Sequence, residues 1–302
     1  MSKPPRLSPP ACARPLTLRT ARGEFAAHEA LPAGPVRGTA LLVPGFTGSK
    51  EDFIGLLEPL AAAGYRTVAV DGRGQHQSRG PRTESAYARE ELALDVLAQA
   101  AALGGTPHLV GHSLGGLISR AAVIREPGSF RSLTLMSSGP AAIAEEQRER
   151  TRLLVSALEA MGEDMPGIWA AMRAMDAPDT VPDGPELAAF LEARWLATVP
   201  EQLMATGRLL VSEPDRVAEL RVAAEGAGLP LLVLSGAVDY AWPVPRMDDM
   251  ARRLGARRVV VPGTEHSPNA EDPQTTAEAL ASFWTACEAG PRGSAAVGSE
   301  GA

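Results

Sequence analysis

Short apolar runs alternate along the chain with longer segments in which apolar residues recur at helical spacing. The runs are bounded by turn residues, as is typical of strands buried on both faces of a sheet; they are Gly38–Val43, Arg66–Val70, Pro107–Val110 and Ser132–Met136. The helical segments between them are Asp52–Ala63, Tyr87–Leu103 and Leu114–Arg125. Strands and helices in alternation predict a mostly parallel sheet with helices on both faces, an α/β fold.

The pattern changes after Pro140. From residue 141 to 225 there is no strand signal, while apolar residues fall repeatedly at helical spacing, as at Leu154, Ala157, Leu158 and Met161. Strand-like runs return at Leu229–Leu234 and Arg257–Val261, with a helix between them at Pro245–Leu254, and a final helix is expected over Thr275–Cys287. The sequence therefore predicts a helical insertion, or cap, over 141–225, within a core formed by 16–140 and 226–288.

The two ends of the chain differ from this core. Residues 1–15 contain five prolines and are expected to form a flexible leader, and residues 289–302 are mainly Gly, Ser and Ala and are expected to be disordered. Between the leader and the first buried strand, Leu16–Leu18 and Glu24–Glu29 flank Arg22-Gly23, which indicates an antiparallel hairpin.

The composition suits a globular enzyme or binding protein that acts on a small molecule. The 302 residues are 45% hydrophobic and 22% charged, and the formal net charge of −7 argues against a general nucleic-acid binder. No apolar stretch reaches the roughly 18 residues that a membrane span needs, so we expect a soluble protein. With only Cys12 and Cys287, neither a disulfide framework nor a metal-ligand cluster is indicated, and a cytoplasmic location is compatible with that. The oligomeric state is left open.

One serine stands out because of its neighbours. Gly111-His112-Ser113-Leu114-Gly115 lies where a predicted strand turns into a predicted helix. Glycines two positions either side of a serine relieve the crowding of a sharp strand-to-helix turn, which exposes the serine hydroxyl. By itself the motif is equally compatible with an ordinary turn, so its meaning depends on whether a base and an acid accompany it.

A serine hydroxyl needs a base within hydrogen-bond reach before it becomes a good nucleophile. Of the five histidines, His28 lies in the hairpin, His108 lies inside a strand and His112 adjoins Ser113 on the turn. His266 follows the last predicted strand, at the carboxyl edge of the sheet where ligands bind in open parallel sheets. His266 is therefore the predicted base.

The acid that would orient this base is predicted to be Asp239. It also follows a strand end, and it lies between the serine and the histidine in chain order. Asp215 and Asp248 are alternatives, but the first falls in the cap and the second in a helix, where a solvated carboxylate is the more common outcome.

These three motifs together resemble the α/β-hydrolase superfamily, whose members carry serine, acid and histidine in this order. The resemblance covers roughly Leu16 to Cys287 and implies the α/β-hydrolase fold with a cap. It also implies that the backbone amides of Phe46 and Leu114 hold the oxyanion. Pro44-Gly45 stands where many relatives have His-Gly, although the Phe46 amide is retained. The run from Pro44 to Ser49 is similar to the corresponding loop of carboxylesterases and monoacylglycerol-lipase-like enzymes, which favours ester substrates.

Several further residues are candidates for lining a substrate pocket. The run from Asp71 to Ser78 resembles a loop near the active site of capped relatives, in which His76 would face the substrate, although a structural loop with Arg73 in a salt bridge is the simpler interpretation. Trp169 and Trp195 in the cap and Tyr240 beside the acid are the other candidates; apolar cap residues at helical spacing also suit a core.

The resulting hypothesis is a serine hydrolase that works through an acyl-enzyme and requires neither a metal nor an organic cofactor. A serine nucleophile argues against haloalkane dehalogenase and epoxide hydrolase chemistry, which uses a carboxylate in this superfamily. A lyase, a cofactor-free peroxidase, an acyltransferase or a non-catalytic binding protein with the same fold remain as alternatives, because a fold does not determine a reaction.

Overall fold

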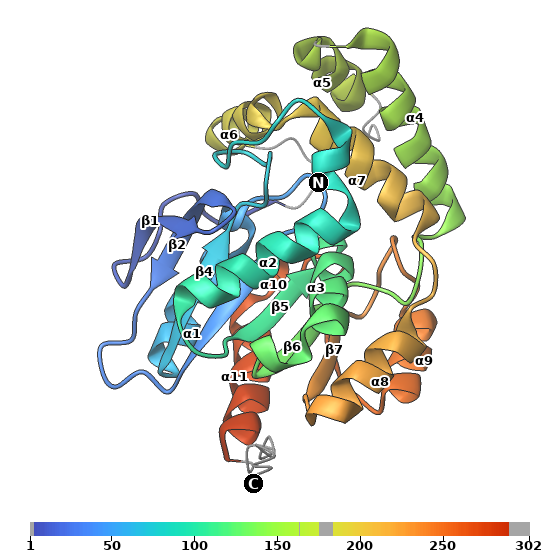
Figure 1. Cartoon of the computed structure of the whole chain (residues 1–302). Coiled ribbons are helices and arrows are strands. Elements are labelled where there is room, and N and C mark those ends of the chain that lie inside the picture. The colour runs from blue at the N-terminus through green and yellow to red at the C-terminus, as the bar shows by residue number, and fades with distance from the viewer. Residues whose placement is uncertain (1–2, 163, 175–183, 290–302) are drawn as a thin grey trace, which may run out of the picture.

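A single eight-stranded sheet organises the protein. The computed structural model describes residues 3–162, 164–174 and 184–289 (Figure 1). The strands are β1 (Ala13–Thr20), β2 (Gly23–Ala30), β3 (Gly38–Val43), β4 (Tyr65–Val70), β5 (His108–His112), β6 (Ser132–Met136), β7 (Leu231–Gly236) and β8 (Arg257–Val261). Their spatial order is β1-β2-β4-β3-β5-β6-β7-β8. The pairs β1–β2 and β2–β4 are antiparallel, and all pairs from β4 to β8 are parallel. The predicted hairpin and mostly parallel sheet are confirmed.

Helices cover both faces of this sheet, as the alternating pattern predicts (Figure 1). The core helices are α1 (Ile54–Ala62), α2 (Arg89–Leu103), α3 (Leu114–Arg125), α8 (Val217–Ala227), α9 (Val244–Leu254), α10 (Pro268–Glu271) and α11 (Pro273–Ala289), with short 3-10 turns η1 (Lys50–Phe53), η2 (Glu84–Tyr87) and η3 (Pro127–Ser129). Residues of α1 and α11 pack in one apolar cluster, and residues of α2, α3, α8 and α9 in another. Every residue of β5, β6 and β7 is buried between these layers, which explains their uninterrupted apolar runs.

Four helices lie above the carboxyl edge of the parallel strands, between β6 and β7 in the chain, and we refer to them as the cap (Figure 1). They are α4 (Glu145–Met161), α5 (Met165–Ala174), α6 (Pro185–Ala197) and α7 (Pro200–Ser212). The predicted cap of 141–225 also contains α8, which packs with core helices: Val217, Leu220 and Ala224 share an apolar cluster with residues of α3 and α9. Helical periodicity identifies a buried face, but it does not say which neighbour covers that face.

Residues 3–15 of the predicted flexible leader lie in part against the core. Residues 13–15 begin β1, and Pro4 and Pro10 are buried. Pro5 lies against Gly55 at the start of α1, and Arg6 pairs with Glu58 of that helix. Proline restricts the chain without preventing it from packing. The predicted disordered tail lies outside the described residues, except for Ala289, which ends α11.

None of the helices within the described ranges has the length and apolar character that crossing a membrane requires.

His108 is a buried structural histidine, as its place inside a strand predicts. Its Nδ1 lies 2.8 Å from Ser132 Oγ and its Nε2 lies 3.1 Å from Glu288 Oε1, and its ring stacks on Trp284. Burial, together with the nearby charge of Arg131, lowers the pKa of His108 to about 3. The folded protein therefore keeps this ring neutral at a pH where the unfolded chain, with an ordinary histidine pKa of about 6.5, binds a proton.

Replacing His108 should make the stability of the protein less sensitive to acid. Because the folded pKa is below the unfolded pKa, the contribution of His108 is fully present above about pH 6.5 and is lost as the pH falls toward 3, by about 1.4 kcal/mol per pH unit. The free energy of unfolding of His108→Gln, measured by urea denaturation between pH 6 and pH 4, should fall less steeply than that of the wild type by about this slope. Equal slopes would contradict a neutral His108.

Candidate active site

Three predicted residues meet at the carboxyl edge of the sheet. Ser113 follows β5, Asp239 lies three residues beyond β7 and His266 lies five residues beyond β8. His266 Nε2 is 3.0 Å from Ser113 Oγ, and His266 Nδ1 is 2.8 Å from Asp239 Oδ2. All three residues are buried. The arrangement is a hydroxyl, an imidazole and a carboxylate in one hydrogen-bonded series, in which a neutral imidazole can accept the proton of the hydroxyl.

The turn that carries Ser113 has strained backbone. Its φ is +55° and its ψ is −120°, in a region that residues other than glycine rarely adopt, and it immediately precedes the first residue of α3. A side-chain carbon at Gly111 would lie 2.4 Å from the carbonyl oxygen of Gly115, and one at Gly115 would lie 2.3 Å from the carbonyl oxygen of Val43. The two glycines are therefore sterically required, which explains the spacing of the motif in the sequence.

Asp239 is held by the backbone of its own loop. Its Oδ1 accepts hydrogen bonds from the amides of Ala241 at 2.8 Å and Trp242 at 2.9 Å, which leaves Oδ2 for His266. The two alternative acids lie elsewhere: Asp215 pairs with Arg253, and Asp248 pairs with Arg258 on the surface. Of the three aspartates considered as candidates for the acid, Asp239 is the one that the fold places beside His266.

His112 contributes a contact that the sequence did not indicate. Its Nε2 lies 2.9 Å from the backbone carbonyl oxygen of His266, so it donates a hydrogen bond across from the serine turn to the histidine loop. Burial, with the neighbouring His266 ring, lowers the pKa of His112 to about 4, which keeps its own ring neutral near pH 7. In the sequence, His112 is marked only by its position directly before Ser113, and that position does not indicate a hydrogen bond to the backbone of His266.

The loop after β3 lies against the nucleophile. A side-chain carbon at Gly45 would lie 3.2 Å from Ser113 Cβ, so the backbone at Gly45 closely approaches the serine. Within the described part of the chain, neither the amide of Phe46 nor that of Leu114 donates to a protein acceptor. Both of the amides predicted to bind an oxyanion are thus uncommitted donors beside Ser113.

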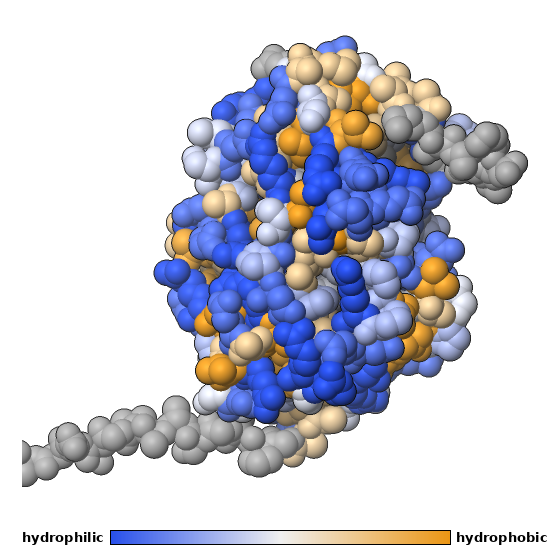
Figure 2. Space-filling model, turned by 90° about the vertical axis from the view of Figure 1, so that its right-hand side faces the viewer, coloured by the Kyte–Doolittle hydropathy of each residue, from blue (hydrophilic) through white to orange (hydrophobic). Residues whose placement is uncertain are grey.

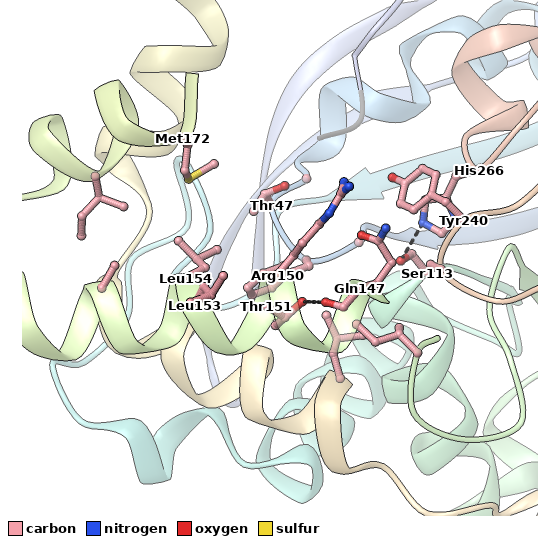
Figure 3. Close-up of a pocket in the computed structure, with 18 of the residues that line it drawn as sticks. Thr47, Ser113, Gln147, Arg150, Thr151, Leu153, Leu154, Met172, Tyr240 and His266 are labelled. Carbon is pink, nitrogen blue, oxygen red and sulfur yellow. Dashed lines mark hydrogen bonds between the residues drawn. The ribbon is translucent and has the colours of Figure 1, made fainter. Parts of the chain in front are cut away.

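A cavity of about 750 Å³ opens above Ser113, between the core and the cap. Figure 3 shows Gln147 of α4 near Ser113, while Leu153, Leu154 and Met172 lie on the side away from it. The lining is mainly apolar toward the cap, where it also includes Ala157, Met161, Ile168 and Ala171. In this view Gln147 and Tyr240 lie beside Ser113, Arg150 and Thr151 come next, and Leu153, Leu154 and Met172 lie farthest from the serine (Figure 3).

The apolar end of this cavity reaches the surface of the cap. Leu153 is 62% exposed and Met161 is 42% exposed, although both line the cavity. On the face drawn in Figure 2, apolar side chains gather at the cap end of the molecule, whereas the core end is mostly hydrophilic.

Of the four pocket residues suggested by the sequence, only Tyr240 lines the cavity, where its ring lies 4.7 Å from the ring of His266. Trp169 and Trp195 instead pack with each other in the apolar core of the cap, contrary to that suggestion. His76 is also outside the lining and has its ring edge against Phe190. Arg73 pairs with Asp95, as the structural interpretation of this loop predicts.

Two buried ion pairs connect the cap region to the core, and neither was predicted. Arg194 of α6 lies 2.8 Å from Asp52, which lines the cavity beside the loop after β3. Burial raises the pKa of Asp52, an effect that the charge of Arg194 opposes. Glu213, directly after α7, lies 2.8 Å from Arg120 of α3. Charged residues are usually exposed, so no sequence pattern singles out these four as buried.

No group of three or more His, Cys, Asp or Glu side chains suited to a metal ion occurs in the ranges that the structure describes.

The model of the alpha/beta hydrolase family matches residues 40–279. The chain is 37% identical over 108 residues to a putative carbamate hydrolase, RutD, of Variovorax paradoxus, a match that covers 35% of this chain and 40% of that protein. It is 29% identical over 244 residues to a monoacylglycerol lipase of Mycolicibacterium smegmatis, covering 76% of this chain and 81% of that one. The structure of a thermophilic esterase from Thermogutta terrifontis has the same fold, with a TM-score of 0.70 and 23% identity over 91% of this chain and 99% of that chain.

Proposed function

The chain belongs to the alpha/beta hydrolase family, and we propose that it is a serine hydrolase that cleaves carboxylic esters through an acyl-enzyme. The observation that carries the proposal is the hydrogen-bonded series from Ser113 through His266 to Asp239, placed beside two uncommitted backbone amides. The relatives named as a lipase and an esterase support ester hydrolysis in general.

In the proposed reaction, His266 Nε2 takes the proton of Ser113 as Oγ attacks the ester carbonyl carbon. The carbonyl oxygen becomes an oxyanion, which the amides of Phe46 and Leu114 stabilise. The intermediate then collapses, the C–O bond to the alcohol breaks, and His266 returns its proton to the leaving alcohol. A water molecule attacks the acyl-enzyme by the same route and releases the carboxylic acid. Asp239 keeps the imidazole in the tautomer whose Nε2 can accept a proton.

The proposed substrate is an ester of an apolar acyl chain and a small polar alcohol. Leu154, Ile168 and Met172 provide the apolar walls for a chain, and the cavity volume of about 750 Å³ lies within the usual range for small-molecule sites. Thr47 and Gln147 lie nearer Ser113 and are suited to hydroxyl groups (Figure 3). A monoacylglycerol, the substrate in the name of the relative from Mycolicibacterium smegmatis, combines these two features.

Turnover should rise with the length of the acyl chain. Burying one methylene contributes about 0.8 kcal/mol, or roughly a fourfold gain in kcat/KM, so p-nitrophenyl hexanoate, with four more methylenes, should exceed the acetate by about 200-fold. Leu154→Gln should reduce this difference while leaving acetate turnover nearly unchanged, because the acetyl group does not reach that wall. Val222→Gln, at an exposed position of α8, is the matched control and should behave as the wild type.

Two other results would contradict parts of this proposal. If the acetate were turned over as fast as the hexanoate or faster, the proposal that the apolar walls of the cavity bind the acyl chain would be wrong. Release of the alcohol without an equimolar amount of carboxylic acid, measured by titration of the acid, would indicate acyl transfer to another acceptor in place of hydrolysis.

A further inference from the structure

Gln75 reaches from the loop after β4 to the loop that carries the Phe46 amide. Its side chain is almost completely buried, with 5% of the residue exposed. Its Nε2 lies 2.8 Å from the carbonyl oxygen of Gly45 and 3.2 Å from that of Phe46. Its Oε1 accepts a hydrogen bond from the amide of Gly72 at 3.0 Å, which fixes which end of the side-chain amide faces the carbonyls.

The Gly45 carbonyl and the Phe46 amide belong to the same peptide group. This group is planar and trans, since the described residues contain no cis peptide bond, so its C=O and N–H point in opposite directions. A partner that holds the Gly45 oxygen therefore also sets the direction of the Phe46 N–H. The oxygen has two such partners, Gln75 Nε2 and the amide of Gly48 at 3.3 Å.

The position of this peptide matters because it begins at Gly45, whose backbone adjoins Ser113: a side-chain carbon at Gly45 would lie 3.2 Å from Ser113 Cβ. An oxyanion hole depends on donors that are aimed before the charge develops. Hydrogen bonds in series also polarise one another, so a donor on the Gly45 oxygen makes the Phe46 N–H a stronger donor.

Gln75 is itself rigidly held. Its backbone amide donates to the Gly72 carbonyl at 3.0 Å, and its backbone carbonyl accepts from the Ser78 amide at 2.8 Å. The same two loops are joined a second time by a buried ion pair, in which Lys50 Nζ lies 3.0 Å from Asp71 Oδ2. Gln75 therefore acts from a fixed support and not from a mobile loop.

We propose that Gln75 is a positioning residue for the reaction: by donating to the Gly45 and Phe46 carbonyls, it aims the Phe46 amide at the oxyanion that forms on attack by Ser113. The inference rests on the proposed function. Gln75 does not contact the substrate, and its side-chain NH2 group has one hydrogen for each of the two carbonyls. Leucine offers no donor, and an ionised glutamate would place negative charge against both carbonyl oxygens.

The first test uses Gln75→Leu, with Gln77→Leu, at an exposed position of the same loop, as the matched control. Loss of a whole oxyanion donor costs about 100- to 1,000-fold in kcat, so misaiming one should cost about 10- to 100-fold. KM for the same ester should change by less than about threefold, because the amide matters mainly in the transition state. The inhibition constant of a trifluoromethyl ketone, whose adduct with Ser113 carries an oxyanion, should rise by about the same factor as kcat falls.

The second test uses Gln75→Glu and does not depend on the leucine variant folding well. A protonated carboxyl group can donate to the Gly45 oxygen and a carboxylate cannot. Burial raises the pKa of such a group. The ratio of variant to wild-type kcat should therefore increase as the pH is lowered from 8 to 5.5, whereas the ratio for Gln77→Glu should stay constant.

The outcomes separate this inference from the function on which it rests. A wild type that cleaves esters, together with a Gln75→Leu kcat within twofold of it or a flat pH ratio for Gln75→Glu, would overturn the role of Gln75 alone. If KM for the ester and the inhibition constant of the ketone rose by the same factor in Gln75→Leu, the role of Gln75 would also be overturned. The variant would then bind the substrate and the transition-state analogue equally less well, which indicates a general loosening of the site. A wild type that neither cleaves esters nor reacts with a fluorophosphonate would overturn both.

Discussion

Ser113→Ala should lower kcat for ester hydrolysis by about a million-fold while leaving the protein folded. The hydroxyl oxygen is the atom that forms the acyl-enzyme, and no other group in the series from His266 to Asp239 can replace it. Because the serine is held on a strained turn by two sterically required glycines, the loss of one hydroxyl should leave the backbone unchanged. Initial rates with p-nitrophenyl hexanoate give the activity, and thermal unfolding gives the stability.

The control for this variant is Ser119→Ala. Ser119 is buried in α3, less than two helical turns beyond the nucleophile, and the serine hydroxyl that lies against His266 Nε2 is that of Ser113. A fluorophosphonate probe, which reacts only with an activated serine, should label the wild type and Ser119→Ala but not Ser113→Ala. Continued labelling of Ser113→Ala would place the nucleophile elsewhere, and a wild type that is never labelled would exclude an activated serine.

Asp239→Asn should lower kcat by about 10,000-fold, although it changes neither the size nor the shape of the side chain. The physical reason lies in the loop that holds the aspartate. The amides of Ala241 and Trp242 both donate to Oδ1, so an asparagine there must keep its oxygen on that side and turn its NH2 toward His266 Nδ1. His266 Nδ1 then becomes an acceptor, its proton moves to Nε2, and the atom that should accept the proton of Ser113 can no longer do so.

Asp248→Asn is the matched control, because Asp248 was an alternative acid and pairs with Arg258 on the surface. Its turnover should stay close to that of the wild type, since an exposed ion pair contributes little to stability. Near-normal activity of Asp239→Asn, at unchanged thermal stability, would contradict its proposed role and require another acid for His266.

The sequence was sufficient for the sheet and for the residues at its edge. Strands buried on both faces appear in the sequence as uninterrupted apolar runs. In a parallel sheet, the residues that directly follow these runs all lie at the carboxyl edge of the sheet. Ser113 and Asp239 follow strands of this kind, and His266 follows β8, an edge strand that is only partly buried. Because all three strands are parallel, the meeting point of these residues could be predicted without knowing the packing of a single side chain. Gly111 was also informative because its reason is local: a side chain there would meet Gly115 of the same turn, whereas one at Gly115 would meet Val43 of β3.

The cap and the supports of the site depended on the tertiary structure. The apolar stripes that contain Trp169 and Trp195 indicated that both side chains are buried. The stripes were compatible with packing against a substrate or against each other, and in the fold the two side chains pack against each other. Gln75 and His112 act through backbone carbonyls from segments that are distant in sequence, and no residue pattern encodes such a pairing. Periodicity determines which face of an element is buried, because it is set by the element's own geometry. Which groups meet across that face is decided by the positions of several loops to within the length of a hydrogen bond, and only the assembled fold sets those positions.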